Sequence, residues 1–396
     1  MASAKESSTK VLDIAGAPLE SEIETLDLTD GVVTDIELLR PALERNLRSS
    51  LGKDGCLDDL IECKLSSLPQ PAAIAPWKEF KYRLYSSKAA TVAIRALLQC
   101  TVPGTDASYA DVFSAIKGAD KTTPAYCFLV GGQVRDVLRG ALSSDVDFNY
   151  ACDARVAALA CVAQGWPTKY KKIGPGSKTP NYVLVGDEAS SCYVEGFATT
   201  FNATTACYNM DFRQNMLFYD LSNDVIIDKT GHGVDDIRGR ALRLSCAGAA
   251  AETFEQWAAA TITPGFKELR YIKFLLRAQS KGEPMAIDDA ECAFVVTSLK
   301  AAMRSNAAAL KGFWFGYALE AQLKSAEGRA ALRRWVVEHG GAHWWASNWA
   351  PLVRACAPAA GKAATTGLWP TTGRGCKLLH WPWRRRSSKV AAAHAL

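Results

Sequence analysis

Two aspartates two residues apart, Asp145 and Asp147, have the residue type and spacing of a metal site. They alternate with Val146 and Phe148, the period-two pattern of a half-buried strand, so both carboxylates should lie on one face with Cα atoms roughly 6.5–7 Å apart. Two such charges repel each other unless a cation lies between them. Magnesium accepts one or two carboxylates and completes its shell with phosphate and water oxygens. The alternative is a solvated strand edge whose aspartates bind nothing.

Two glycines precede these aspartates in the chain. Residues 126–130 form an apolar run typical of a buried strand, and Gly131 and Gly132 interrupt it. Residues 133–140 have the apolar spacing of a helix, so the glycines should lie between a strand and a helix start. Backbone N–H groups at a helix start attract phosphate, and the lack of side chains lets the phosphate come close. Arg135, in the first turn, would add a counter-charge.

Residues 129–148, LVGGQVRDVLRGALSSDVDF, resemble the signature of the poly(A) polymerase head domain, which class II CCA-adding enzymes and bacterial-type poly(A) polymerases share. Later segments follow in the family's order, among them CYVEGFATT, which contains Glu195, and a run that begins at Asp211. The resemblance covers residues 126–277. The matching residues are Gly131, Gly132, Arg135, Asp136, Gly140, Asp145, Asp147, Asp211, Phe212, Asn215, Asp228, Gly231, Asp236, Arg240 and Arg243.

The resemblance implies a fold and a set of residue roles. The fold would be an α/β (α+β) nucleotidyltransferase head with a mostly antiparallel sheet, followed by an all-helical neck and body. An aspartate in the pocket can accept a hydrogen bond from a ribose 2′-hydroxyl, although Asp211 could instead be a helix-start residue that bonds local backbone. The implied roles are catalysis and two Mg²⁺ ions for Asp145 and Asp147, with Glu195 as a further candidate metal ligand, and nucleotide binding for Gly131, Gly132, Arg135, Asp136, Asp211 and Asn215.

The activity implied by the resemblance is transfer of a nucleotide from ATP or CTP to an RNA 3′-hydroxyl. Two metal ions would assist the transfer, and pyrophosphate would leave. The expected acceptor is the 3′ end of tRNA, as in CCA addition. Poly(A) addition to an mRNA 3′ end is the alternative within the same class. A head domain that has lost catalysis and only binds RNA or nucleotide is the alternative of a different class.

Three departures from the family's pattern motivate that last alternative. Asn209 and Met210 stand where the family has a pair of arginines directly before Asp211, so a permanently charged guanidinium is missing there. Residues 263–267 replace the E-D-x-x-R motif that reads the incoming base, and Thr200 replaces a further arginine. The choice of base is therefore not implied. Retention of both Asp145 and Asp147 argues for activity, because an unneeded pair of adjacent carboxylates destabilises the fold by repulsion.

Length and composition fit a globular protein of several domains. The chain has 396 residues, of which 48% are hydrophobic and 22% charged. Tryptophans are concentrated in the second half, where helical spacing favours core packing over base stacking. The expected regions are a disordered N-terminus over 1–35, a helical N-terminal extension over 36–120, the head over 121–246, a helical neck and body over 252–350, and a basic, loosely ordered tail over 351–396.

The remaining features bear on location and partners. No run of 18 apolar residues occurs, and the acidic start lacks a signal-peptide pattern and argues against a transit peptide, so we expect an intracellular protein, cytoplasmic or nuclear, without membrane contact. The twelve cysteines have no C-x-x-C spacing and should be reduced. In the tail, Arg384, Arg385 and Arg386 are candidate RNA contacts; a nuclear-targeting or solvated tail is the alternative. The sequence specifies no oligomeric state.

Overall fold

The computed structural model describes most of the chain between residues 40 and 356. The regions expected as a disordered N-terminus and as a basic tail with Arg384, Arg385 and Arg386 lie outside the described residues, apart from residues 351–356, and so does Asp145. The described residues are 40–41, 44–45, 55–71, 82–119, 121, 126–143, 146–171, 182–187, 194–198, 211–245, 254–259, 265–305, 310 and 315–356.

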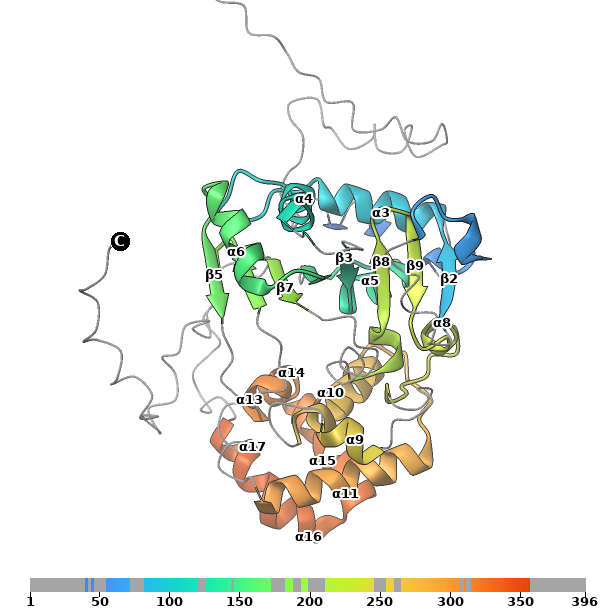
Figure 1. Ribbon diagram of the computed structural model, residues 1–396. Coiled ribbons are helices and arrows are strands. Elements are labelled where there is room, and N and C mark those ends of the chain that lie inside the picture. The colour runs from blue at the N-terminus through green and yellow to red at the C-terminus, as the bar shows by residue number, and fades with distance from the viewer. Residues whose placement is uncertain are drawn as a thin grey trace, which may run out of the picture. The chain divides into compact units, whose positions relative to one another are not determined.

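One sheet of nine strands organises the first part of the described chain (Figure 1). Its order is β1-β2-β9-β8-β3-β4-β7-β6-β5, and every neighbouring pair is antiparallel except β4 and β7, which run parallel. This confirms the expected mostly antiparallel sheet. The strands are β1 (Ile61–Cys63), β2 (Arg83–Ser86), β3 (Cys127–Val130), β4 (Val146–Tyr150), β5 (Thr168–Lys171), β6 (Tyr182–Val185), β7 (Val194–Ala198), β8 (Leu217–Asp220) and β9 (Val225–Asp228).

The sheet begins earlier in the chain than the sequence predicts. Strand β2 pairs with β9, and β1 pairs with β2, so these two strands form one edge of the sheet. Helices α3 (Lys88–Leu98) and α4 (Tyr109–Ala119) bury their apolar faces in the core of the same domain. The described residues 55–71 and 82–119 thus contribute strands and helices to the sheet and its core, whereas the sequence predicts a helical extension over residues 36–120.

The two faces of the sheet are covered differently. Helices α3, α4, α5 (Gly132–Leu138) and α6 (Ala154–Ala163) share one core with the inward side chains of the central strands, among them Leu129. The opposite face carries a smaller apolar cluster that includes Val130. In β4, Val146 and Phe148 point into the helix-covered core while Asp147 is only half-buried. The alternation read from the sequence is therefore confirmed over residues 146–148, whereas Asn149 is buried.

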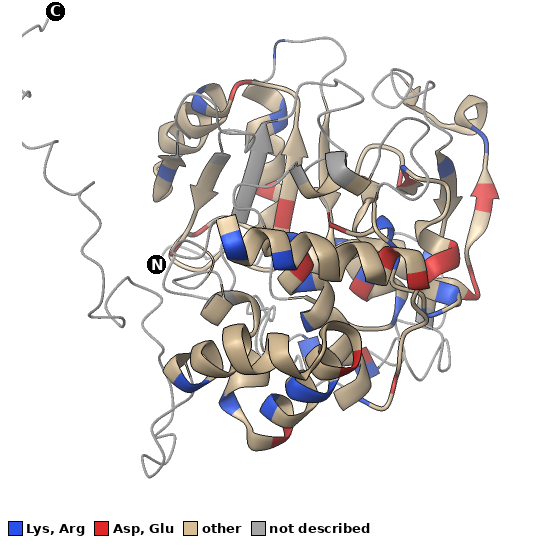
Figure 2. Ribbon diagram, turned by 90° about the horizontal axis from the view of Figure 1, so that it is seen from below, with Lys and Arg blue, Asp and Glu red and all other residues tan. Residues whose placement is uncertain are grey.

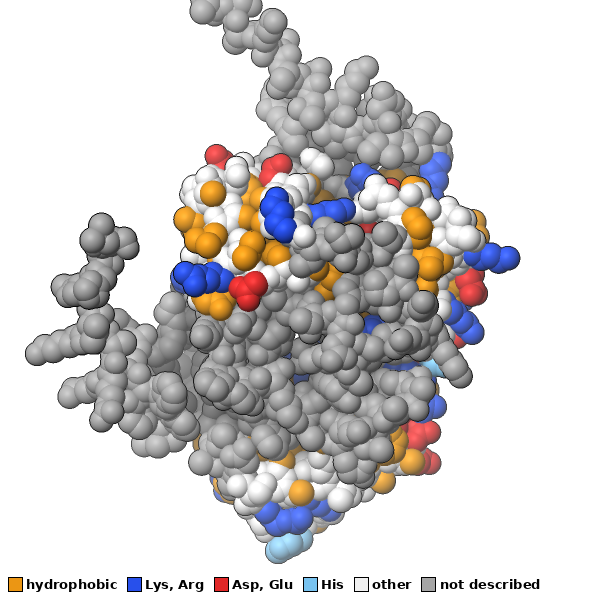
Figure 3. Space-filling model, viewed as in Figure 1, with side chains coloured by type: hydrophobic (Ala, Val, Ile, Leu, Met, Phe, Trp, Pro, Cys, Tyr) orange, Lys and Arg blue, Asp and Glu red, His pale blue; other side chains and the backbone are white. Residues whose placement is uncertain are grey.

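Helix α6 keeps part of its apolar surface in solvent. Val156, Leu159 and Val162 repeat every three residues and are 42%, 58% and 54% exposed. The space-filling view shows hydrophobic side chains gathered in the region of α6 and β5 (Figure 3). The described part of the chain does not cover this stripe.

Helices make up the rest of the described chain, which confirms the expected helical body. Trp257, Trp335, Trp344 and Trp349 are buried in its core, so these tryptophans pack the interior as predicted. Basic and acidic residues are interspersed over the helices (Figure 2). The elements are α9 (Phe254–Ala259), α10 (Phe266–Ser280), α11 (Asp289–Ser305), α13 (Phe315–Ala318), α14 (Glu320–Lys324), α15 (Ala326–Gly340), α16 (Ala342–Trp344), the π-helix η7 (Trp345–Trp349) and α17 (Ala350–Cys356).

The described residues also bear on where the helical body ends and on the state of the cysteines. Helix α17 continues to Cys356, so ordered helix extends past the boundary drawn at residue 350. The eight cysteines in the described ranges form no disulfide bond, and most are buried. No helix within these ranges is long and apolar enough to cross a membrane.

Candidate active site

Strand register places Asp147 beside the diglycine and beside Glu195. Asp147 lies opposite Val130, the last residue of β3, and Gly131 follows at once. On its other side, the backbone of Asp147 pairs in parallel with that of Glu195 in β7. Neighbouring strands are about 4.8 Å apart. The residues expected to hold metal and phosphate therefore lie on, or directly after, the adjacent central strands β3, β4 and β7.

The described side chains contain one member of the expected metal set. Asp147 is half-buried on the face opposite the helices, whereas Asp145 lies outside the described residues and only the backbone of Glu195 is described. Among the described residues, no group of three His, Cys, Asp or Glu side chains gathers to hold a metal. Carboxylate oxygens are the hard ligands that Mg²⁺ takes, and Asp147 is the one carboxylate of the expected metal set whose side chain is described.

Gly131 adopts a backbone that other residues rarely accept. Its φ is +74° and its ψ is −132°, and its N–H donates to the carbonyl of Leu217 at 3.2 Å. A Cβ added to Gly131 would meet no atom within 4 Å. The chain thus turns sharply from β3 into α5 and leaves open space beside the glycine.

Alanine at Gly131 should lower the free energy of unfolding by about 1–3 kcal/mol, because a side chain strains a backbone with this positive φ. Gly132→Ala is the matched control. Gly132 is helical, and its Cβ would come no closer than 3.4 Å to Arg135 Nη2. We expect that change to alter stability by less than about 1 kcal/mol. Denaturant unfolding of both variants measures the difference; equal losses would contradict a role for the positive φ.

A chain of polar contacts joins four of the predicted nucleotide-binding residues. Arg135 Nε donates to Asp136 Oδ1 at 2.7 Å, and its Nη1 donates to Asn215 Oδ1 at 2.6 Å. Asn215 Nδ2 donates to Asp211 Oδ1, also at 2.6 Å. Arg270 Nε then donates to Asp211 Oδ2. Arg270 is not among the site residues predicted from the sequence.

Asp211 is the centre of this chain of contacts. Its side chain is 7% exposed. Its Oδ1 also accepts the N–H of Phe212 at 3.1 Å, and its carbonyl accepts Trp257 Nε1 at 2.8 Å. Burial alone would raise the pKa of Asp211, but the charge of Arg270 and the hydrogen bonds hold it below its usual value. The carboxylate is therefore ionised and bonds both local backbone and a distant cation.

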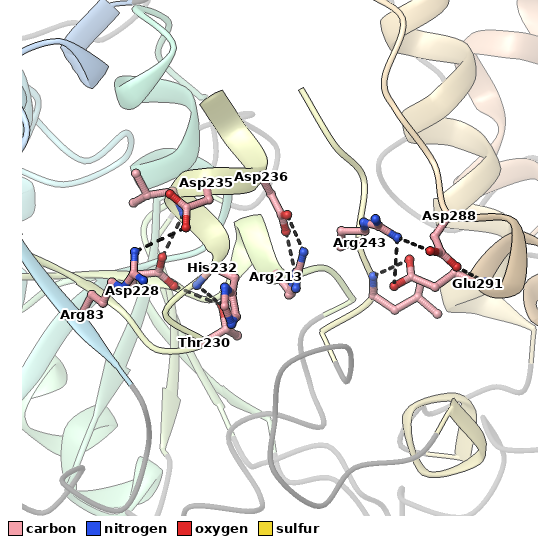
Figure 4. Close-up of polar contacts among 12 residues, drawn as sticks. Arg83, Arg213, Asp228, Thr230, His232, Asp235, Asp236, Arg243, Asp288 and Glu291 are labelled. Atoms are coloured by element: carbon pink, nitrogen blue, oxygen red, sulfur yellow. Dashed lines mark hydrogen bonds and ion pairs between the residues drawn. The ribbon is translucent and has the colours of Figure 1, made fainter. Parts of the chain in front are cut away.

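Buried ion pairs anchor the segment that carries Asp211 and Asn215. Arg213 donates twice to Asp236 in α8 (Gly233–Arg238), with Nε to Oδ2 at 2.7 Å and Nη2 to Oδ1 at 2.5 Å. Figure 4 shows these two side chains facing each other through both bonds. Asp236 was matched from the sequence, but its partner was not. The pair fixes the 3-10 turn η5 (Arg213–Asn215) against the helix.

A second ionic cluster joins this segment to the helical body. Arg243 Nη1 lies 2.8 Å from Asp288 and 3.9 Å from Glu291 of α11 (Figure 4). Glu291 is 2% exposed and accepts the N–H of Leu244 at 3.2 Å. Burial raises the pKa of Glu291 to about 7, although the Leu244 hydrogen bond and Arg243 oppose the rise. The protonation of Glu291 is therefore coupled to the contacts of Arg243 and Leu244 with α11.

The free energy of unfolding should fall as the pH rises from about 4.5 to about 7, by on the order of 2–3 kcal/mol from Glu291. Within this window the folded protein keeps the Glu291 proton that the unfolded chain has lost. The stabilisation from the raised pKa of Glu291 is therefore complete below pH 4.5 and is lost as the pH rises to about 7. Glu291→Gln should remove it, whereas Asp289→Asn, at an exposed position of the same helix, should not. Unfolding curves at pH 5 and 7.5 test this. Parallel pH profiles for wild type and Glu291→Gln would contradict it.

Comparison with solved structures finds similarity to enzymes that process tRNA. A CCA-adding enzyme with ATP is 16% identical, with a TM-score of 0.43 over 59% of this chain and 52% of its own. The Thermotoga maritima CCA-adding enzyme complexed with tRNA is 16% identical, with a TM-score of 0.45 over 60% and 52%. A tRNA nucleotidyltransferase with a primer tRNA and an ATP analogue is 16% identical, with a TM-score of 0.40 over 57% and 61%.

The chain spans about half the length of the first two of these solved proteins. No protein-family model matches the sequence. No curated protein matches it either.

Proposed function

We propose that this protein is an RNA nucleotidyltransferase that transfers a nucleotide from ATP or CTP to an RNA 3′-hydroxyl and releases pyrophosphate. The observation that carries the proposal is the strand register that sets Asp147 next to Val130-Gly131 on one side and Glu195 on the other. Acidic ligands and a phosphate-binding turn are the two parts that phosphoryl transfer needs side by side. The D-x-D and diglycine motifs of the sequence agree with that assignment.

In this proposal Asp145 and Asp147, with Glu195 as a further ligand, hold two magnesium ions. When bound, the ions neutralise phosphate charge and make the attacking hydroxyl more acidic. The chain's own residues position the reactants. The open backbone at Gly131 and Gly132 admits the triphosphate.

The nucleotide contacts come from the polar chain around Asp211. Arg135, held by Asp136 and Asn215, faces the triphosphate with a fixed positive charge. Asp211 and Asn215 orient the ribose. The ionised Asp211 carboxylate can accept a hydrogen bond from a ribose hydroxyl.

We propose the 3′ end of tRNA as the acceptor. Arg384, Arg385 and Arg386 are proposed to contact the RNA backbone, since arginines bind phosphate strongly. The base-reading motif of the resembled family is absent from residues 263–267. The added base is therefore identified by the extension assay and not from the sequence.

The test is an extension assay with purified protein, Mg²⁺ and each of the four ribonucleoside triphosphates. One primer is a tRNA without its terminal CCA, and the other is oligo(A). Growth of the tRNA with C and A supports the proposal. Growth of oligo(A) alone would instead assign poly(A) addition. RNA binding without any extension would overturn the transferase proposal and leave a binding protein.

A further inference from the structure

Arg270 occupies a position that the sequence motifs do not assign. It lies in the first turns of α10, a helix of the body, and its Nε donates to the buried Asp211. Its own side chain is 27% exposed. A cation from the body therefore reaches a residue proposed to orient the nucleotide.

A buried carboxylate needs a cation or several hydrogen bonds to remain ionised. In the resembled family, arginines stand directly before this aspartate, but here Asn209 and Met210 carry no charge. Arg270 supplies a guanidinium to Asp211 from 59 residues further along the chain. The missing local charge is thus provided from another element.

The surroundings of Arg270 hold more positive charge than the nearby carboxylates offset. The guanidinium carbons of Arg135 and Arg270 lie 5.2 and 5.6 Å from the centroid of the same Phe274 ring. Arg139 is close enough that burial first, and then the charge of Arg135, lower its pKa to about 10. The charges of Arg240 and Glu283 also act on Arg139. Among the described residues, this group therefore holds four arginines and three carboxylates, the other two being Asp136 and Asp211. Such an excess of positive charge is relieved by a polyanion.

We propose that Arg270 is a positioning residue for the ribose and triphosphate of the incoming ribonucleoside triphosphate, so that helix α10 completes a pocket built mainly by the head. This inference rests on the proposed function. Arg270 holds the Asp211 carboxylate in the orientation that accepts from the ribose 2′-hydroxyl. With Arg135, which lies near the same Phe274 ring, it also forms one wall of the triphosphate site.

The experiment measures equilibrium binding of ATP, CTP and their 2′-deoxy forms to the full-length protein in Mg²⁺. Arg270→Gln should weaken ribonucleotide binding by about tenfold or more, as expected for loss of a charge-assisted contact. It should also bring the ratio of ribo- to deoxyribonucleotide affinity close to about one, because Asp211 loses its orientation. Arg270→Lys should fall between wild type and Arg270→Gln, since lysine keeps the charge but not the fork.

Arg277→Gln is the matched control, since it removes the same charge from an exposed position of the same helix. We expect it to change affinity by less than about twofold. Melting curves on each variant separate loss of fold from loss of binding. For a variant that does not fold, Asp211→Asn provides the same ribose-to-deoxyribose comparison.

The outcomes distinguish this inference from the proposed function. Suppose that the wild type binds nucleotide and that Arg270→Gln binds it equally well, or loses the same affinity for ribo and deoxy forms. That outcome overturns only the proposed role of Arg270. Binding that depends on Arg270 in a protein that extends no RNA overturns only the transferase. Absence of nucleotide binding by the wild type overturns both.

Discussion

Asparagine in place of Asp147 should reduce nucleotide addition by about a thousandfold or more, which corresponds to roughly 4 kcal/mol of transition-state stabilisation. Asparagine keeps the size of the side chain but removes the negative charge that the proposed metal site requires. Asp147 is half-buried on β4, between Val130 and Glu195 in register, so a neutral side chain should fit without displacing the strand. Initial rates of primer extension measure the effect.

Asp106→Asn is the control, because Asp106 is exposed and lies in the loop before α4. It should extend the primer at the wild-type rate. Melting temperatures show whether Asp147→Asn remains folded. A folded Asp147→Asn variant with more than about a tenth of the wild-type rate would exclude Asp147 as an essential metal ligand.

Alanine in place of Arg213 should lower the free energy of unfolding by about 3–5 kcal/mol, because it leaves the buried Asp236 carboxylate without its cation. The side chains of the pair are only 13% and 6% exposed, and both guanidinium bonds are short. Burial raises the pKa of Asp236 even with Arg213 present, which shows how strongly the site disfavours an isolated charge. Chemical denaturation, analysed with one m-value for wild type and variant, measures the loss of unfolding free energy.

Arg83→Ala provides a matched control on the neighbouring pair with Asp235. That pair is 3.4 Å apart and its side chains are 42% and 48% exposed, so its loss should cost less than about 1 kcal/mol. The double variant Arg213→Ala/Asp236→Ala should recover part of the stability lost in Arg213→Ala, since no unpaired charge remains. Equal losses for Arg213→Ala and Arg83→Ala would contradict a burial-dependent ion pair.

Local patterns were sufficient to predict the centre of the head. The apolar run before Gly131, the helical spacing after it and the alternation around Asp147 correspond to β3, α5 and β4 within two residues at each end. These elements are fixed by side-chain periodicity and by a glycine turn, both of which depend on residues close in sequence. The proposed metal and phosphate positions follow directly from them.

Long-range pairing could not be read in the same way. Strand β1 has three residues and β2 has four, too few for a period to be recognised, and β2 is held by β9. The contact of Arg270 with Asp211 likewise depends on how the helical body packs against the head. Composition predicted that body and its buried tryptophans, but no spacing in the sequence links a residue of α10 to Asp211, which precedes η5.

The edge position of β1 and β2 has a consequence for synthesis on the ribosome. Both strands leave the exit tunnel long before β9, to which β2 pairs, so they must wait while β3 to β8 are made. Non-local pairing of this kind slows folding and leaves strand edges open to wrong partners. A nascent chain that stops before residue 225 would hold β1 and β2 without β9, the strand that joins them to the rest of the sheet, and we expect such chains to depend on chaperones until β9 emerges.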